Sequence, residues 1–285
     1  MNDVSTTQMA RREKNGVNVL MSTHKGENGH NLAEALESLY AQTVTPDRIV
    51  LVLDGYVGQD QHDVISFYGA DRRGPDLTIV ALPSNSGLAH ALNAGLAYCD
   101  GDFVMRMDSD DICMPDRLAL QLAYIKEHPE TDLISSWASE FTVGEPTEKM
   151  KVSPTEHDAL AMALRWRNVI AHSAILIRTS TLTRVGGYRA DFGLLEDYDL
   201  WVRLMTKGAR FHVLPKVLLR IRTSLAQRGR RGNLAYLRNE IRFRSECLRI
   251  GFLTRSQFIA TLGLYAMFRL AGPMLRNQFY ALART

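Results

Sequence analysis

Short apolar runs alternate with helix-like patterns through the first half of the chain. Four runs have the length and near-continuous apolar character of buried strands: residues 17–21, 48–53, 77–82 and 102–107. Between the first two, apolar residues recur at helical spacing, at Leu32, Leu36 and Leu39. This alternation predicts an α/β fold in which a mainly parallel sheet lies between layers of helices, a Rossmann-like three-layer sandwich.

Local signals mark where helices begin. Asn31 followed by Glu34 resembles a capping box, so we expect the first helix to start near Asn31. Pro115 suits the first turn of the helix that follows the fourth strand. The second half is less regular, but the carboxylates of Glu196 and Asp197 open another helical pattern, as the helix dipole favours.

Composition narrows the class of protein. The 285 residues are 46% hydrophobic and 23% charged, which is typical of one globular domain with or without an appendage. The three cysteines are far apart in the sequence, so we expect a reducing, cytoplasmic compartment and no disulfide framework. A net charge of +3 without a nucleic-acid-binding motif argues against a nucleic-acid partner. Residues 1–15 are polar, and we expect a disordered lead-in there.

The C-terminal region is basic. Residues 220–255 contain ten arginines against two glutamates, a local balance of 10 − 2 = +8, and a segment rich in leucine and aromatics follows. One interpretation is a solvated helix followed by a helix that packs on the main domain. The other is an amphipathic tail over 220–285 that lies on an anionic membrane surface, at the inner face of the cell membrane. The sequence leaves both open.

Polar residues follow three of the predicted strands directly. Thr23 and Glu27 follow the first, Asp54 follows the second, and the acidic loop Asp108–Asp111 follows the fourth. Ligands of parallel α/β sheets bind beyond the carboxyl ends of the strands. We therefore expect these side chains to face one crevice.

Several kinds of site could explain the acidic loop. An EF-hand counted from Asp108 would need glycine at Cys113 and glutamate at Ala119, so that site is excluded. The glycine patterns of P-loops and dinucleotide sites are also missing. A helix cap would explain only one aspartate. A magnesium or manganese ion shared with a substrate diphosphate explains more, because such ions take one or two protein carboxylates and offset their repulsion.

The motifs together resemble a known family. In order along residues 17–222 they are VNVLMSTHKGE, AEALESLYAQT, RIVLVLDG, NSGLAHALNAGLAYCDGDFVMRMDSDD, MPDRL and GGYR…LLEDYDLWVRL. This set is similar to the family-2-type inverting glycosyltransferases with the GT-A fold, above all those of bacterial exopolysaccharide, capsule and O-antigen synthesis. The resemblance implies a catalytic domain over 16–222, with a nucleotide-sugar half at 16–115 and an acceptor half at 116–222, and a helical C-terminal region at 223–285.

The same resemblance implies roles on the donor side. Asp108 and Asp110 correspond to the family's D-x-D pair, with Asp110 as the first choice of ligand for Mn²⁺ or Mg²⁺ and Asp111 beside them orienting the pair or contacting sugar hydroxyls. The other residues implied to bind the nucleotide-sugar are Thr23, Glu27, Asp54, Asn85, Gly87 and Arg222. Among these, Arg222 stands where many members have a histidine, and we expect it to neutralise the diphosphate. We expect Arg106 to be a surface or ion-pair residue.

On the acceptor side, the family's catalytic base lies in an acidic pair that corresponds to Glu196-Asp197, and we assign the base to Asp197. Two further residues are weaker candidates for acceptor contacts. His172 precedes a predicted strand and could equally be a core histidine. Trp166 lies in the irregular half, where a tryptophan is more often core than a sugar-stacking platform.

The resemblance also implies the reaction. A hexose or N-acetylhexosamine would move from a UDP-sugar to a hydroxyl of a lipid-linked oligosaccharide by metal-dependent direct displacement. Two other classes remain open. One is a sugar-nucleotidyltransferase, although its G-x-G-T-R loop is absent. The other is a non-catalytic, membrane-associated scaffold with the same fold.

Overall fold

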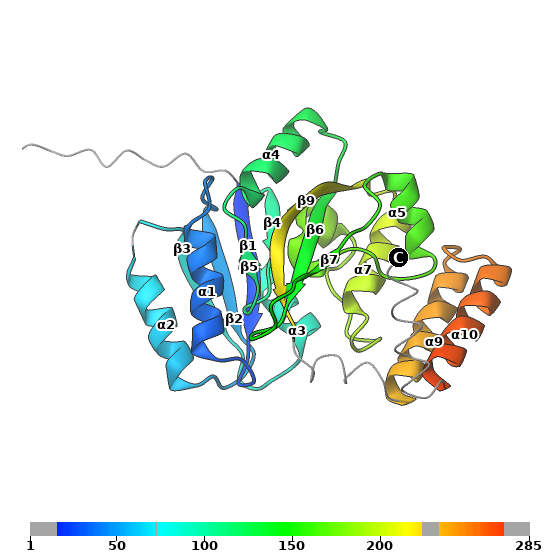
Figure 1. Ribbon diagram of the computed structural model, residues 1–285, viewed down its shortest axis with the longest axis horizontal. Coiled ribbons are helices and arrows are strands. Elements are labelled where there is room, and N and C mark those ends of the chain that lie inside the picture. The colour runs from blue at the N-terminus through cyan, green and yellow to red at the C-terminus, as the bar shows by residue number, and fades with distance from the viewer. Residues whose placement is uncertain (1–15, 72, 224–233, 271–285) are drawn as a thin grey trace, which may run out of the picture.

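The structure is a computed structural model that describes residues 16–71, 73–223 and 234–270 (Figure 1). The predicted lead-in 1–15 lies outside the described residues. The strands are β1 (Val17–Thr23), β2 (Arg48–Leu53), β3 (Asp76–Ala81), β4 (Phe103–Arg106), β5 (Ile112–Cys113), β6 (Leu133–Phe141), β7 (Lys149–Lys151), β8 (Leu176–Arg178) and β9 (Phe211–Arg222). The helices are α1 (Gly29–Tyr40), α2 (Gln59–Ala70), α3 (Leu88–Leu96), α4 (Arg117–Glu127), α5 (His157–Leu164), the 3₁₀ turn η1 (His172–Ala174), α6 (Thr179–Arg184), α7 (Glu196–Thr206), α9 (Leu234–Arg249) and α10 (Arg255–Leu270).

The strands form one sheet in the order β3-β2-β1-β4-β8-β6-β9-β5, with β7 paired to β6. The first four in this order are parallel, and β6 and β9 are also parallel. Strand β8 joins the two groups through antiparallel pairs with β4 and β6. The predicted α/β sandwich with a mainly parallel sheet is confirmed, and antiparallel pairing is confined to the second half of the order.

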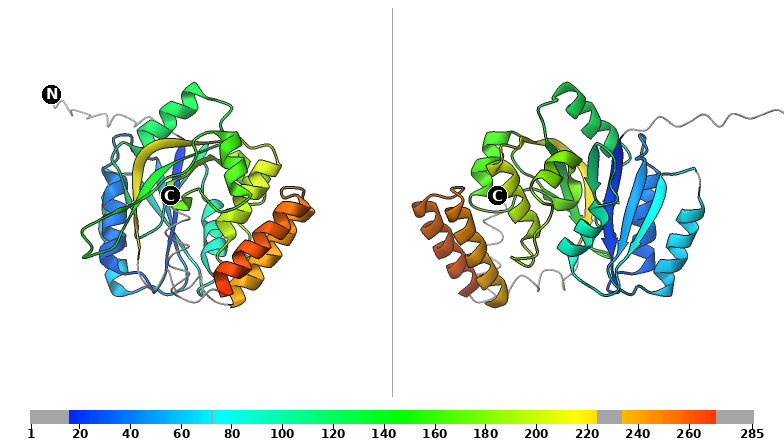
Figure 2. Two further views of the ribbon diagram at one scale, coloured as in Figure 1. Left: turned by 45° about the vertical axis from the view of Figure 1, so that its right-hand side comes forward. Right: turned by 180° about the vertical axis from the view of Figure 1, so that it is seen from behind.

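Helices cover both faces of the sheet (Figures 1 and 2). Alternate residues of β1 point to opposite faces, so Met21 packs with Leu36 of α1 in one apolar cluster while Leu20 packs with Leu92 of α3 in the other. Close packing of α3 depends on Gly95, because a Cβ there would lie 2.6 Å from Leu20 Cδ1. The strands are thus buried on both sides, which explains their near-continuous apolar sequences.

Two predicted helix starts are displaced by two residues. Helix α1 begins at Gly29, and Asn28 is its N-cap, with Oδ1 accepting from Asn31 N at 2.8 Å. The capping box predicted at Asn31 is therefore wrong, because an asparagine three residues earlier takes that position. Helix α4 begins at Arg117, so Pro115 precedes its first turn.

The C-terminal helices α9 and α10 lie side by side at the edge of the molecule beyond α7 (Figure 1). On α9, Phe243 and Cys247 are buried in the same apolar cluster as Tyr198 of α7. This face of the α9–α10 hairpin packs on the rest of the fold, and the buried residues lie on the basic helix α9, which the first interpretation predicted to be solvated. Within the described ranges, no helix combines the length and apolar character needed to cross a membrane.

Candidate active site

The carboxyl ends of the parallel strands lie at one edge of the sheet. Thr23 at the end of β1 pairs with Leu53 at the end of β2, and Leu53 pairs with Ala81 at the end of β3. Strand β4 ends beside β1, where Met107 N donates to Leu20 O at 3.2 Å. The polar residues that follow these strands therefore share one edge, as the sequence predicted.

Asp54 organises the loop that follows β3. Its Oδ1 accepts from Ser86 N at 2.6 Å and its Oδ2 accepts from Gly87 N at 2.9 Å. The turn after Asp54 passes close to this loop, because a Cβ on Gly55 would lie 2.5 Å from Asn85 N. The structure thus brings Asp54, Asn85 and Gly87 together and shows Asp54 holding a backbone loop; a contact of Asp54 with a nucleobase stays a prediction.

Thr23 and Glu27 lie in the loop after β1. The Thr23 side chain is buried, and its Oγ1 accepts from Gln61 Nε2 on α2 at 2.7 Å. Glu27 Oε1 accepts from Asn31 Nδ2 at 2.7 Å and from Asn28 N at 3.0 Å. Thr23 thereby links this loop to α2. The charge of Glu27 acts on the acidic loop, where it contributes to raising the pKa of Asp110.

The acidic loop connects β4 to β5, and its three aspartates have different surroundings. Asp111 is buried and its Oδ1 accepts from Arg222 N at 3.0 Å, while Asp108 is partly exposed and paired with Arg106. Burial raises the pKa of Asp111 and the charges of Asp108 and Asp110 raise it further. The pKa of Asp110 is raised to about 7, first by burial and then by the charges of Asp108 and Glu27.

This crowding fits a divalent cation. A cation would offset the mutual repulsion that raises the pKa of Asp110. The surrounding donors are carboxylate oxygens, which Mg²⁺ and Mn²⁺ prefer. In the part of the chain that the structure describes, no three His, Cys, Asp or Glu side chains are grouped to hold an ion by themselves. The carboxylates of the acidic loop therefore fit such a cation, while its binding together with a substrate diphosphate stays a prediction.

Asp197 lies in the first turn of α7. Its Oδ2 accepts from Asn168 Nδ2 at 2.7 Å, and its Oδ1 accepts from Tyr198 N at 2.7 Å. The neighbouring Glu196 is buried, and its pKa is raised to about 7, chiefly by burial and also by Asp197. Each carboxylate has a different constraint: Asp197 is oriented by hydrogen bonds, whereas Glu196 is desolvated.

His172 lies among aromatic residues. Its Nε2 is 3.0 Å from the Tyr188 hydroxyl, and its ring is 5.8 Å from that of Trp201 on α7. Burial lowers its pKa well below the usual value, and the charge of Arg106 lowers it further. The imidazole is therefore neutral at pH 7 and is held by the core, while acceptor contact by His172 stays a prediction.

Arg106 interacts electrostatically both with the acidic loop and with the carboxylates at the start of α7. The side chain is 1% exposed, and Nε and Nη1 have no hydrogen-bond partner in the described residues. Its charge lowers the pKa of Asp110 and of Glu196, against the larger effect of burial. The expectation of an ion-pair residue is met by its pairing with Asp108, but Arg106 is buried and lies within electrostatic reach of both the acidic loop and the start of α7.

The remaining two predicted residues are Arg222 and Trp166. Arg222 donates from Nε to Asp110 O at 3.0 Å and from Nη2 to Glu34 Oε2 at 2.5 Å, so its guanidinium braces the acidic loop. Trp166 is 41% exposed in the loop after α5. A role of Arg222 at the diphosphate and an acceptor contact of Trp166 stay predictions.

The sequence reasoning missed Asn168 and Tyr188. Asn168 contacts Asp197 across 29 positions, and Tyr188 contacts His172 across 16. Tyr188 belongs to the GGYR motif, but the motif alone assigns it no role, and Asn168 lies in none of the quoted motifs. Only the tertiary contacts identify what these two side chains do.

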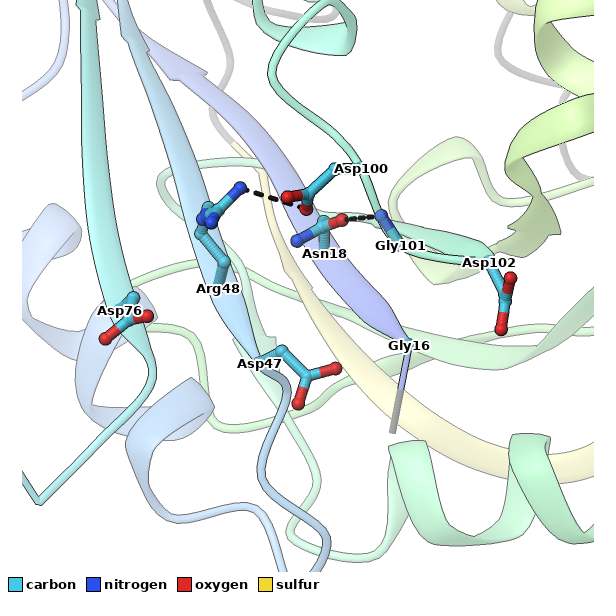
Figure 3. Close-up of a pocket in the computed structure, with 8 residues that line it drawn as sticks. All are labelled: Gly16, Asn18, Asp47, Arg48, Asp76, Asp100, Gly101 and Asp102. Atoms are coloured by element: carbon cyan, nitrogen blue, oxygen red, sulfur yellow. Dashed lines mark hydrogen bonds and ion pairs between the residues drawn. The ribbon is translucent and has the colours of Figure 1, made fainter. Parts of the chain in front are cut away.

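A separate hollow of about 170 Å³ lies at the opposite, amino-terminal ends of β1–β4 (Figure 3). Aspartates line much of it, and Arg48 pairs there with Asp100 at 2.9 Å. Asn18 closes it from β1 by accepting from Gly101 N. None of the residues predicted to bind ligand at the carboxyl ends of the strands lines this hollow.

Residues 19–188 match glycosyl transferase family 2. The chain belongs to this family. Membership makes it a glycosyltransferase and disfavours the nucleotidyltransferase alternative. Two relatives are the amylovoran biosynthesis glycosyltransferase AmsE of Erwinia amylovora, 35% identical over 78% of this chain and 82% of its own, and a UDP-Gal:α-D-GlcNAc-diphosphoundecaprenol β-1,3-galactosyltransferase of Escherichia coli, 31% identical over 92% and 94%.

Solved structures share the fold. S. aureus TarS 1–349 in complex with UDP-GlcNAc superposes with a TM-score of 0.68 at 18% identity, over 91% of this chain and 74% of that one. The mannosyltransferase PcManGT of Pyrobaculum calidifontis, in complex with GDP-Man and Mn²⁺, gives a TM-score of 0.62 at 19% identity, over 91% and 71%. These similarities confirm the GT-A fold of this family 2 glycosyltransferase.

Proposed function

We propose that this glycosyltransferase moves a hexose or N-acetylhexosamine from a UDP-sugar to a hydroxyl of a lipid-linked glycan, with inversion, during synthesis of a surface polysaccharide. The observation that carries the proposal is that the buried Arg106 pairs with Asp108 of the acidic loop and also acts electrostatically on Glu196 beside Asp197. The acidic loop, which would bind the donor, and the proposed base Asp197 are thus within electrostatic reach of one another, as a single displacement needs.

The donor would lie across the strand ends. Asp54 holds the loop of Asn85 and Gly87. These three residues, with Thr23 and Glu27, would contact the nucleotide. Asp108 and Asp110 would hold Mn²⁺ or Mg²⁺, which when bound neutralises the charge of the leaving diphosphate. UDP is supported as the carrier by the UDP-GlcNAc complex of TarS and by the name of the E. coli relative.

Asp197 would act as the base. Hydrogen bonds from Asn168 and from the Tyr198 backbone restrain the orientation of the carboxylate. It accepts the proton of the acceptor hydroxyl while that oxygen bonds to the anomeric carbon, and the nucleoside diphosphate leaves from the opposite face. A positioned base typically contributes about 10²–10⁴-fold. A pKa of about 7 would also suit a base, so Glu196 is tested beside Asp197.

A lipid-linked acceptor is supported by two observations. The E. coli relative is named for a diphosphoundecaprenol acceptor. The C-terminal hairpin exposes arginines, such as Arg238 and Arg242, and the apolar residues Ile241 and Ile259, although Arg242 also lies over the ring of Phe192 at 6.0 Å. Such a surface suits anionic lipid at the inner face of the membrane, where the protein would be peripheral.

A screen of nucleotide-sugars tests the proposal. Purified protein is incubated with UDP-hexoses and UDP-N-acetylhexosamines, a synthetic lipid-diphosphate-linked sugar and Mn²⁺, with chelator as the control. We expect release of UDP and a glycosylated lipid, both abolished by chelator. Release of pyrophosphate would instead indicate a nucleotidyltransferase, and absence of turnover with every donor would indicate a non-catalytic scaffold.

A further inference from the structure

The loop that carries Asn168 has no regular structure of its own. It follows α5, contains no helix or strand through residue 171, and exposes Trp166. Yet Asn168 places an amide 2.7 Å from Asp197 Oδ2, and its own Oδ1 accepts from Ile170 N at 3.3 Å. A side chain that orients the base must itself be fixed. Something other than local secondary structure has to fix this loop.

The C-terminal hairpin supplies that restraint. Arg244 of α9 donates from Nη1 to Arg165 O at 2.9 Å and from Nη2 to Trp166 O at 3.0 Å. Tyr265 of α10 donates its hydroxyl to the same Trp166 carbonyl at 3.0 Å. Three hydrogen bonds from the hairpin therefore end on two consecutive peptide groups just before Asn168.

Arg244 is built into the fold. The side chain is 1% exposed, and its guanidinium lies 5.4 Å from the ring of Tyr198 and 4.8 Å from that of Tyr265. The carboxylate of Glu240 is 3.6 Å away, whereas the two loop carbonyls lie within hydrogen-bond distance of the guanidinium. Because a buried guanidinium is costly to leave unbonded, the hairpin and the loop stabilise each other's positions.

The hairpin also contacts Tyr198, the residue that follows the proposed base. Tyr198 directly follows Asp197, and its backbone N–H is the second donor to that carboxylate. The Tyr198 ring packs against Phe243 at 4.7 Å, and its hydroxyl donates to Leu164 O, one residue before the braced peptides. Both donors to Asp197 are thus attached to elements that the hairpin contacts.

We propose that the hairpin α9–α10 positions the base: Arg244 and Tyr265 fix loop 165–168, so that Asn168 holds Asp197 in the orientation needed for proton transfer. Asn168, Arg244 and Tyr265 are positioning residues, and the proposal rests on the proposed role of Asp197. The C-terminal region would then contribute to catalysis, in addition to any contact with a membrane.

A double-mutant cycle tests this coupling. We expect Arg244→Lys, which cannot bond both carbonyls in the same way, to lower kcat by about tenfold or more, since small displacements of a reacting group are costly. The KM and Kd for the UDP-sugar should not change, because the donor residues are elsewhere. Arg249→Lys is the matched control, because Arg249 lies on the same helix but pairs only with Glu246 in the described structure.

Asn168→Ala should lower kcat as well, and the double variant with Arg244→Lys should lose less than the product of the two single losses, because the brace acts in part through Asn168. Tyr265→Phe removes one hydroxyl and keeps the ring, so it provides a milder variant if Arg244→Lys fails to fold. Rates are divided by the fraction of protein that binds UDP, which removes misfolding from the comparison.

Hydrogen exchange over residues 165–171 gives a readout that does not need turnover. It should be faster in Arg244→Lys than in Arg249→Lys. Equal exchange in these two variants, an unchanged kcat in Tyr265→Phe and Arg244→Lys, or full additivity with Asn168→Ala would each overturn the positioning role. Lack of transfer by the unmodified protein with every donor would instead overturn the proposed function.

Discussion

The two halves of the catalytic fold build their parts of the site in different ways. In residues 16–115, each candidate residue lies at the carboxyl end of a parallel strand or in the loop after it, and strand register brings these ends to one edge. In residues 116–222, Asp197 and His172 are held by side chains far along the chain, Asn168 and Tyr188. The first half would position the donor by backbone topology, and the second would position the proposed base by side-chain contacts.

The largest expected effect concerns the second half. Asp197→Asn should lower transfer by about 10²–10⁴-fold, because the amide cannot accept the acceptor's proton. Binding of UDP measured by calorimetry should be preserved, since the strand ends are untouched. Glu196→Gln is the matched comparison one residue earlier, and it should keep most activity. Loss of transfer in Glu196→Gln with retention in Asp197→Asn would move the base to Glu196.

A matched pair tests the first half. Asp110→Asn should lower metal-dependent turnover by on the order of 10²–10³-fold, because it removes charge stabilisation of the leaving group. Asp111→Asn should be far milder, since asparagine Oδ1 can still accept from Arg222 N. Mn²⁺-dependent binding of UDP, measured by titration, distinguishes the two. Equal losses in both variants would contradict the division of the acidic loop.

These comparisons show what the sequence could predict. The sheet and the gathering of Thr23, Asp54 and the acidic loop follow from apolar periodicity and from the rule for strand ends, both of which are local. The start of α1 was misplaced because Asn28 and Asn31 are both good caps, and only the hydrogen bond distinguishes them. Asn168 and the buried position of Arg106 depend on contacts across the fold, which no spacing in one sequence encodes.

A smaller expected effect is the pH dependence of the free energy of unfolding, to which the acidic loop and the start of α7 each contribute one carboxylate. Asp110 and Glu196 have pKa values raised to about 7 in the folded protein, from 3.8 and 4.5. Between about pH 4 and pH 7 the folded state therefore binds more protons than the unfolded state, and their contribution to the free energy of unfolding falls as pH rises.

Urea unfolding across this range should show a flatter pH dependence in Glu196→Gln than in the unmodified protein, because one of these groups is gone. His172, whose lowered pKa acts in the opposite direction, is common to both proteins and cancels in the difference. An identical pH dependence in the two proteins would contradict the raised pKa of Glu196.

The smallest expected effect concerns the C-terminal hairpin. Arg242 is exposed on α9, and its replacement by alanine should weaken binding to phosphatidylglycerol vesicles by about 1 kcal/mol, or roughly fivefold. Lys126→Ala removes an equal charge from α4 and should have no effect. Co-sedimentation at low and physiological salt measures both, with neutral vesicles as a further control. Equal weakening by both variants would contradict a membrane contact through the hairpin.

The stereochemistry of the first turnover tests the central claim most directly. Nuclear magnetic resonance of the product, formed from an α-linked UDP-sugar, reports the anomeric configuration of the new bond. A single displacement with Asp197 as base predicts a β-linked product. An α-linked product would contradict the account, because a single displacement with attack opposite the leaving group inverts the anomeric carbon.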